Sequence, residues 1–143
     1  MNSNPNLNNV VFYVLVVDDD QDDQYFIRKA INHVIPQAIV ESLYDGDEAL
    51  AYLKRCSALP NLIILDLNMT RLSGKETMRI IRKNESLSHV PVVVLTTSKN
   101  EEERKELLGL GASAFYTKPH HARDLEGIMR EVAEKWLEVY VQG

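Results

Sequence analysis

The stretch Leu62-Ile63-Ile64-Leu65-Asp66 has four apolar residues in a row and ends on a carboxylate. A strand that is apolar on both faces needs helices on both sides, as in the parallel sheet of an α/β protein. Asp66 would then follow the central strand at its carboxyl end. In open α/β sheets ligands bind at this edge, where the chain connections diverge. The stretch therefore predicts a buried central strand with a functional residue at its end.

Short runs rich in β-branched residues alternate with longer amphipathic runs on both sides of this stretch. Such alternation is typical of βαβ units around a parallel sheet. It predicts strands at 11–17, 38–44, 62–65, 90–95 and 112–117. It predicts helices at 22–35, 46–56, 75–84, 101–110 and 125–140. The expected fold class is α/β, a (βα)5 doubly wound sheet of five parallel strands.

The chain length predicts one domain. With 143 residues, of which 45% are hydrophobic, the chain can bury one core but not two. Residues 1–9 include five asparagines and little that can be buried, so ordering them would cost more entropy than it returns. We therefore expect a disordered tail at 1–9 and one domain at 10–143.

Composition excludes several classes of protein. The net charge of −5 argues against binding to nucleic-acid phosphates. Cys56 is the single cysteine, so no internal disulfide can form, which fits a reducing cytoplasm. No apolar run approaches the roughly 20 residues of a membrane helix, and the N-terminus does not resemble a signal peptide. We expect a cytoplasmic protein with neither a membrane nor a nucleic-acid partner.

Acidic residues also follow the first predicted strand, where Asp18 and Asp19 come directly after Val17. Because the carboxyl ends of parallel strands meet at one edge, both side chains should lie near Asp66. Clustered carboxylates repel one another unless a cation compensates their charge. Ligands that are all oxygen suit a hard ion such as Mg²⁺. These three residues therefore predict a magnesium site.

Two further polar residues close predicted strands. Thr96 ends the fourth strand, and Lys118 ends the fifth, immediately before Pro119. A carboxylate that accepts a phosphoryl group needs its added charge offset, and a hydroxyl and an ammonium can do this. Either residue alone would be read as an ordinary strand or surface residue. Their coincidence with acids at two other strand ends favours one shared site.

Other charged residues have simpler interpretations. Asp20, Asp22 and Asp23 begin the first predicted helix, where acids are stabilised by the helix dipole, and we assign them that role. The run 101–103 of three glutamates has the same interpretation, with a partner surface as a second meaning. The histidines, including the adjacent His120 and His121, are interpreted as surface residues.

Four motifs resemble the receiver domains of bacterial response regulators: Val-Val-Asp-Asp-Asp at 16–20, Leu-Asp-Leu-Asn-Met at 65–69, Val-Leu-Thr-Thr-Ser at 94–98 and Gly-Ala-Ser-Ala-Phe-Tyr-Thr-Lys-Pro at 111–119. The resemblance runs without a gap from 11 to about 140. It implies a flavodoxin-like receiver fold and a phosphoacceptor function in two-component, His-to-Asp signal transduction. The chain looks most like the stand-alone, single-domain regulators, including the phytochrome-associated kind.

The resemblance implies roles for individual residues. Asp66 matches the aspartate that is phosphorylated. Asp18 and Asp19 match the acidic pair that binds Mg²⁺ together with Asp66 and the backbone carbonyl of Asn68. The implied phosphoryl donor is a sensor histidine kinase or a phosphotransfer protein, and the receiver assists its own phosphorylation and dephosphorylation.

The same resemblance implies how the signal leaves the site. Thr96 matches the switch hydroxyl, Phe115 the switch aromatic residue, and Lys118 the lysine that binds the phosphoryl group. The bond from Lys118 to Pro119 would be cis. The surface that changes would be formed by the fourth helix, the fifth strand and the last helix, and it would suit a homodimer or another protein partner.

The sequence departs from the family pattern at two positions. Thr70 and His120 replace the usual proline and phenylalanine, which affects loop rigidity and surface recognition rather than phosphorylation.

The Asp66 motif also resembles that of haloacid dehalogenase-type phosphatases, but Asn68 cannot replace their second acid as a proton donor. A pseudo-receiver would lack an acid or the lysine, and this chain has them all.

The last predicted helix carries a broad apolar margin. Trp136, Leu137, Val139 and Tyr140 extend beyond the stripe that one core requires. An exposed apolar margin often marks a partner site. The alternative is that Trp136 and Tyr140 fold back on the domain or cover the first strand, and the sequence leaves both interpretations open.

Overall fold

The predicted parallel sheet is present. The computed structural model describes residues 11–138, and the predicted tail at 1–9 lies outside them. All strand pairs are parallel, and the strand order is β2-β1-β3-β4-β5. The strands are β1 (Phe12–Val17), β2 (Ala38–Leu43), β3 (Leu62–Leu65), β4 (Val92–Thr96) and β5 (Ala114–Thr117).

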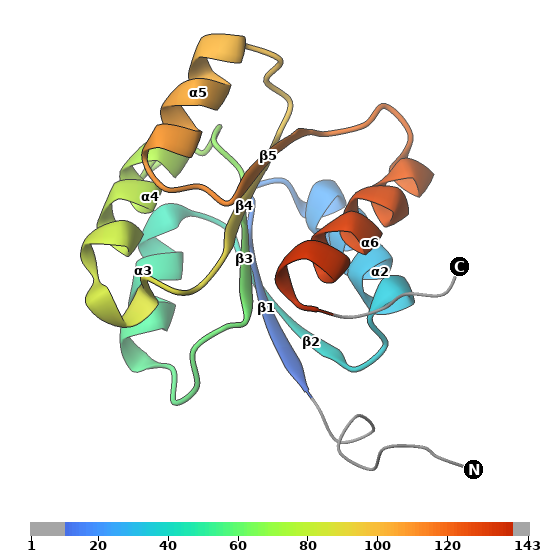
Figure 1. Cartoon of the computed structure of the whole chain (residues 1–143), viewed down its shortest axis with the longest axis horizontal. Coiled ribbons are helices and arrows are strands. Elements are labelled where there is room, and N and C mark those ends of the chain that lie inside the picture. The colour runs from blue at the N-terminus through green and yellow to red at the C-terminus, as the bar shows by residue number, and fades with distance from the viewer. Residues whose placement is uncertain (1–10, 139–143) are drawn as a thin grey trace.

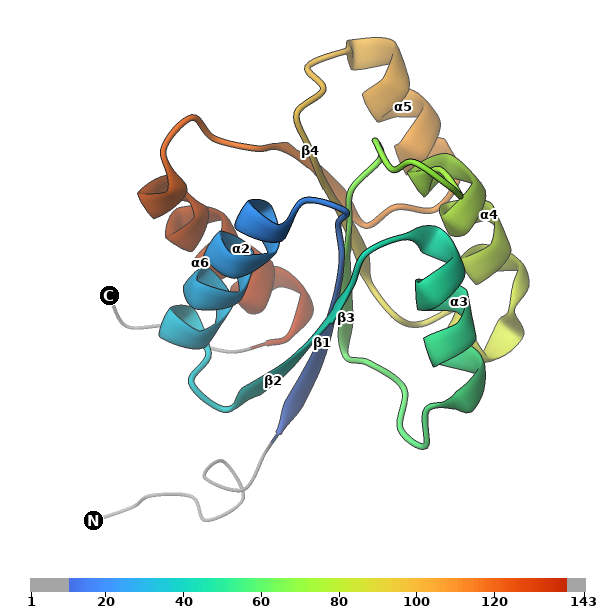
Figure 2. The same ribbon diagram turned by 180° about the vertical axis from the view of Figure 1, so that it is seen from behind.

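Helices cover both faces of the sheet. They are α2 (Gln21–Val34), α3 (Gly46–Arg55), α4 (Gly74–Lys83), α5 (Glu101–Gly109) and α6 (Leu125–Trp136), with short 3₁₀ turns η1 (Glu85–Leu87) and η2 (Ala122–Asp124). Helices α2 and α6 lie on one face, and α3, α4 and α5 lie on the other (Figures 1 and 2). The (βα)5 doubly wound fold predicted from the sequence is therefore confirmed.

The helix starts follow from local hydrogen bonds. Helices α2 to α5 each begin after a polar residue whose side chain accepts a backbone N–H three residues later, and these residues are Asp20, Asp45, Ser73 and Asn100. Capping of this kind satisfies a donor that would otherwise lack a partner at the helix terminus. Since each cap follows closely on a strand end, it also sets where the chain turns back over the sheet.

The core consists of two apolar clusters, one on each face of the sheet. Along β3, Leu62 and Ile64 belong to the cluster beneath α2 and α6, while Ile63 and Leu65 belong to the cluster beneath the other three helices. All four side chains are buried. Alternate side chains of a strand point to opposite faces, so a central strand covered on both faces must be apolar throughout.

The last helix is shorter than predicted. It ends at Trp136, where the Leu137 N–H still bonds to the Ala133 carbonyl oxygen, and Glu138 then adopts a left-handed conformation with φ of 55°. Apolar spacing continues past this turn in the sequence, which is why spacing alone overestimated the helix. The predicted positions Val139 and Tyr140 lie outside the described residues.

Trp136 packs against the core rather than standing clear of it. Its side chain is partly buried and contacts the cluster beneath α2 and α6, which also receives Phe12. This placement agrees with the interpretation that Trp136 folds back on the domain. Among the helices within residues 11–138, none has the length and apolar character needed to cross a membrane.

Candidate functional site

The carboxyl edge of the sheet gathers the residues that the sequence placed at strand ends. Asp18 follows β1, Asp66 follows β3, Thr96 ends β4 and Lys118 follows β5. The Lys118 Nζ lies 2.8 Å from Asp18 Oδ2 and 3.7 Å from Asp66 Oδ2. The predicted convergence of these side chains is therefore present.

Asp66 is the buried centre of this group. Its side chain is 6% exposed, and Oδ1 accepts a hydrogen bond from the Leu67 N–H at 2.9 Å, while Oδ2 faces Lys118. The pKa of Asp66 is raised to about 6, and burial is the largest cause. The Lys118 charge opposes this shift, and the Asp18 charge adds to it. A carboxylate in this position is not fully neutralised by its protein partners.

Asp18 and Asp19 form an unequal pair. Asp18 is buried, and its Oδ1 accepts a hydrogen bond from the Asp20 N–H at 2.9 Å. Burial raises the pKa of Asp18, and the contact with Lys118 opposes this shift. Asp19 is less buried, and one carboxylate oxygen from each of Asp18, Asp19 and Asp66 lies within 4.8 Å of the others. Three carboxylates this close, with only oxygen donors, fit a hard divalent cation.

Lys118 is the cation that the protein itself supplies. Its side chain is 11% exposed. Burial lowers the pKa of this ammonium, but contacts with Asp18, Asp23 and Asp66 outweigh burial and raise the pKa above its usual value. Lys118 is therefore charged throughout the physiological pH range.

Asp23 is a site residue that the sequence reasoning missed. Its Oδ2 accepts a hydrogen bond from Lys118 Nζ at 2.7 Å, so its assignment as a helix-start acid alone is wrong. The first turn of α2 passes over the carboxyl edge directly after β1, which brings this carboxylate to Lys118. The other two assignments agree with the structure, since Asp20 caps α2 and Asp22 is exposed in its first turn.

Gln24 is a second missed residue. It is buried, and its Nε2 lies 2.9–3.1 Å from the carbonyl oxygens of Val16, Asp18 and Leu43. The amide therefore ties the ends of β1 and β2 to α2 and supports the backbone of Asp18. A glutamine within an amphipathic helix carries no sequence signal for such a role.

Thr96 and Phe115 lie on the same face of the sheet. Thr96 is completely buried, and its hydroxyl has no hydrogen-bond partner within the described part of the chain. The hydroxyl still lowers the pKa of Asp66, because it favours the charged carboxylate. Phe115 pairs with Val94, two residues before Thr96, and is only partly buried. Side chains two residues apart on a strand share a face.

The remaining predicted features lie at the rim. Asn68 is exposed, with its Nδ2 3.5 Å from Thr97 Oγ1. The predicted cis bond between Lys118 and Pro119 is wrong, because every peptide bond that the structure describes is trans. The trans form is the lower-energy isomer even before proline. The Lys118 N–H still donates to the Thr96 carbonyl oxygen at 2.7 Å.

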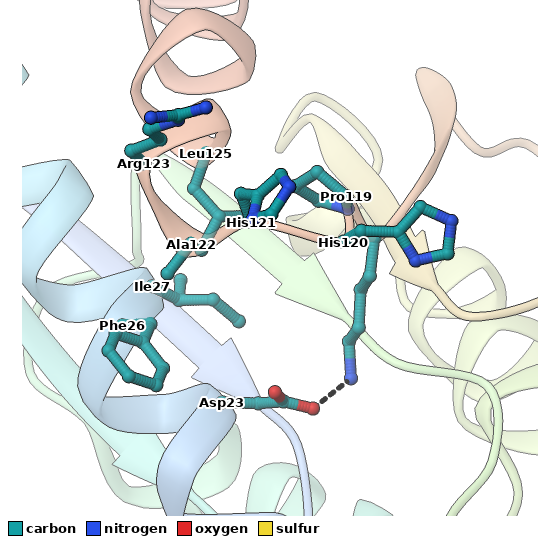
Figure 3. Close-up of a pocket in the computed structure, with 10 residues that line it drawn as sticks. Asp23, Phe26, Ile27, Pro119, His120, His121, Ala122, Arg123 and Leu125 are labelled. Atoms are coloured by element: carbon teal, nitrogen blue, oxygen red, sulfur yellow. Dashed lines mark hydrogen bonds and ion pairs between the residues drawn. The ribbon is translucent and has the colours of Figure 1, made fainter.

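A pocket of about 540 Å³ adjoins the site on the α2 side (Figure 3). Phe26 and Ile27 of α2 form one wall, and the chain from Pro119 to Leu125 forms the other. Asp23 and Lys118 meet where the pocket reaches the acidic site. His120 and His121 are exposed at its rim, in agreement with their interpretation as surface residues.

Comparison with known proteins agrees with this geometry. The model of the response regulator receiver domain matches residues 14–130. Response regulator Rcp1 of Synechocystis is 32% identical over 130 residues, which cover 87% of this chain and 88% of that protein.

Solved structures give the same result. The phosphorylated cyanobacterial phytochrome response regulator RcpA has a TM-score of 0.84 and 29% identity, covering 94% of this chain and 100% of that chain. The Mn²⁺-bound form of Rcp1 has a TM-score of 0.80 and 31% identity, covering 92% of this chain and 99% of that one. The chain belongs to the response regulator receiver domains, the phosphoacceptor family of two-component signal transduction.

Proposed function

We propose that Asp66 is the residue that accepts the phosphoryl group. The observation that carries this proposal is the buried Asp66 carboxylate, which faces the Lys118 ammonium at 3.7 Å beside two further carboxylates at the carboxyl edge of the sheet. Nucleophile, cation and acidic pair come from three different strand ends. The phosphorylated state of the relative RcpA supports the same chemistry here.

The chemical step is an in-line transfer from a phosphohistidine. Asp66 Oδ2 attacks phosphorus, the new O–P bond forms, the N–P bond of the donor breaks, and the leaving imidazole keeps the electron pair and takes a proton. We assign Oδ2 to the new bond because Oδ1 already accepts the Leu67 N–H, whereas Oδ2 faces Lys118. Such transfers depend on positioning and on offsetting charge.

Mg²⁺ is the proposed cofactor. Asp18, Asp19, Asp66 and the backbone carbonyl of Asn68 would hold it, and the three neighbouring carboxylates and the raised pKa values of Asp18 and Asp66 support a cation at this position. When bound, the ion would offset the charge of the phosphoryl oxygens. The Mn²⁺-bound form of Rcp1 supports a divalent-ion site in this chain.

Lys118 and Thr96 would bind the phosphoryl oxygens and convert the modification into a structural change. The buried Thr96 hydroxyl lacks a full hydrogen-bond partner within the described residues, so a phosphoryl oxygen on Asp66 would give it one. The inward movement of Thr96 would leave space for Phe115 to turn inward on the same sheet face. By this account the receiver assists its own phosphorylation and dephosphorylation, and phosphorylation shifts the population between two packings.

The proposed partners are a sensor histidine kinase or phosphotransfer protein in the cytoplasm and, for output, a second copy of the chain. The output surface would be formed by α5, β5 and α6. Tyr116 of β5 donates a hydrogen bond to Glu131 of α6 at 2.8 Å, so a movement of β5 would be transmitted to this surface.

The direct test is modification with acetyl phosphate and Mg²⁺. Wild type should gain one phosphoryl group by intact-mass analysis, and Asp66→Asn should gain none, because the amide is not a nucleophile here. Labelling of the variant at the wild-type rate would refute the assignment of Asp66.

A further inference from the structure

The ammonium of Lys118 is shared unequally among three carboxylates. Its shortest contact is to Asp23 Oδ2 at 2.7 Å, followed by Asp18 at 2.8 Å and Asp66 at 3.7 Å. The proposed phosphoacceptor is thus the most distant of the three. Figure 3 shows the Asp23 carboxylate reaching from α2 to this ammonium.

We propose that Asp23 is a positioning residue that restrains Lys118 in the unphosphorylated receiver. By this restraint, Asp23 lowers the affinity of the receiver for a phosphoryl group. This inference rests on the proposed function of Asp66. By this inference, α2 helps to determine how tightly the site binds a phosphoryl group.

Two electrostatic effects act in the same direction. An ammonium has three donors, and the two short contacts hold it toward Asp18 and Asp23. A phosphoryl group on Asp66 would have to draw Lys118 toward itself against the Asp23 charge. The Asp23 charge would also repel the added negative charge, because both groups would contact the same ammonium. Both effects disappear when Asp23 loses its charge.

The exposure of the pair determines the size of the effect. The Asp23 side chain is 38% exposed and lines the pocket, whereas the Asp18 side chain is only 2% exposed. Water screens a pair of this kind, so its strength resembles that of a surface ion pair rather than a buried one. The restraint is therefore weak enough for a phosphoryl group to overcome.

Binding of beryllofluoride, a stable phosphoryl mimic, tests this inference with the intact chain and Mg²⁺. By calorimetry, Asp23→Asn should bind about two- to fivefold more tightly than wild type, the range expected for an exposed ion pair. Asp23→Ser should show the same increase. Asp23→Glu keeps the charge and should restore affinity to the wild-type value.

Asp22→Asn is the matched control. It removes an equal charge from the same turn of α2, where Asp22 is exposed, and should leave affinity unchanged. A readout at the lysine itself is the side-chain ¹⁵N signal of Lys118, which should broaden through faster proton exchange in Asp23→Asn but not in Asp22→Asn. Thermal unfolding would establish that all variants are folded.

Equal or weaker beryllofluoride binding by folded Asp23→Asn and Asp23→Ser would overturn the inference and leave the role of Asp66 intact. An equal increase in Asp22→Asn would also overturn it, because general charge rather than the contact would then be responsible. Failure of wild type itself to bind beryllofluoride would remove the proposed function first and this inference with it.

Discussion

Replacing Gly74 by alanine tests how closely α4 packs against the Asp66 segment. A Cβ at this position would lie 2.5 Å from the Asp66 carbonyl oxygen and 2.6 Å from Leu67 Cα. Both neighbours are backbone atoms, so no side chain can rotate away. The Gly74 N–H also donates to the Leu67 carbonyl oxygen at 3.1 Å, which holds the two segments together.

The expected cost follows from overpacking, which costs about 1–3 kcal/mol. Gly74 is the first residue of α4, so the advantage of alanine over glycine in the middle of a helix does not apply. Gly74→Ala should therefore lower the free energy of unfolding by about 1–3 kcal/mol. Because the displaced backbone carries Asp66, labelling by acetyl phosphate should also slow.

Gly127→Ala is the control. This glycine lies in α6, and an added Cβ meets nothing within 4 Å. The change should raise the free energy of unfolding by about 0.5–1 kcal/mol and leave labelling unchanged. Urea unfolding of both variants gives the comparison. If Gly74→Ala is as stable as wild type and labels at the same rate, the close packing inferred between α4 and the Asp66 segment is incorrect.

Three further predictions concern charge and assembly. Without a divalent ion, Asp66→Asn should stabilise the fold by about 1–3 kcal/mol at pH 7. Folding raises the pKa of this carboxyl from 3.8 to about 6, so the charged carboxylate costs stability as the pH rises through that window, and the cost is absent below pH 3.8. A stability gain of Asp66→Asn that does not vary with pH in urea unfolding would contradict this. Asp19→Ala should abolish Mg²⁺-dependent labelling by acetyl phosphate, and metal-independent labelling at the wild-type rate would refute it. Beryllofluoride should strengthen homodimer formation by about 1–3 kcal/mol in sedimentation equilibrium, and identical association with and without it would remove the dimer.

Much of the fold and half of the site could be predicted from local patterns. The apolar run before Asp66 identified the central strand, because a strand covered on both faces leaves no polar position. Asp18, Thr96 and Lys118 were found by the same argument, since the direction of a parallel strand determines the edge at which its last residue lies. The roles of Asn68 and the switch residues, by contrast, came only from the family resemblance.

The misses share a physical cause. Asp23 and Gln24 act through contacts across the fold, with Lys118 and with the ends of two strands, and helix periodicity does not encode such pairings. The end of α6 was overestimated because apolar spacing continues where the backbone turns at Glu138. A different cause applies to the Lys118 to Pro119 bond: its cis form was implied only by the family resemblance, and the structure has the trans form that is intrinsically favoured.

The charge balance at the carboxyl edge connects stability with function. Asp18 and Asp66 are buried at this edge, and the carboxylates of Asp19 and Asp23 lie close to the same site. Among these side chains, Lys118 alone is positively charged. Burial raises the pKa of both buried acids, so their charged forms lower the stability of the fold at neutral pH. A hydrophobic replacement would remove this cost, but it would also remove the attraction for a divalent cation and the proposed nucleophile. The excess of negative charge favours a cation at this site. In our proposal, the contact with Asp23 also keeps the Lys118 ammonium away from Asp66 until a phosphoryl group arrives.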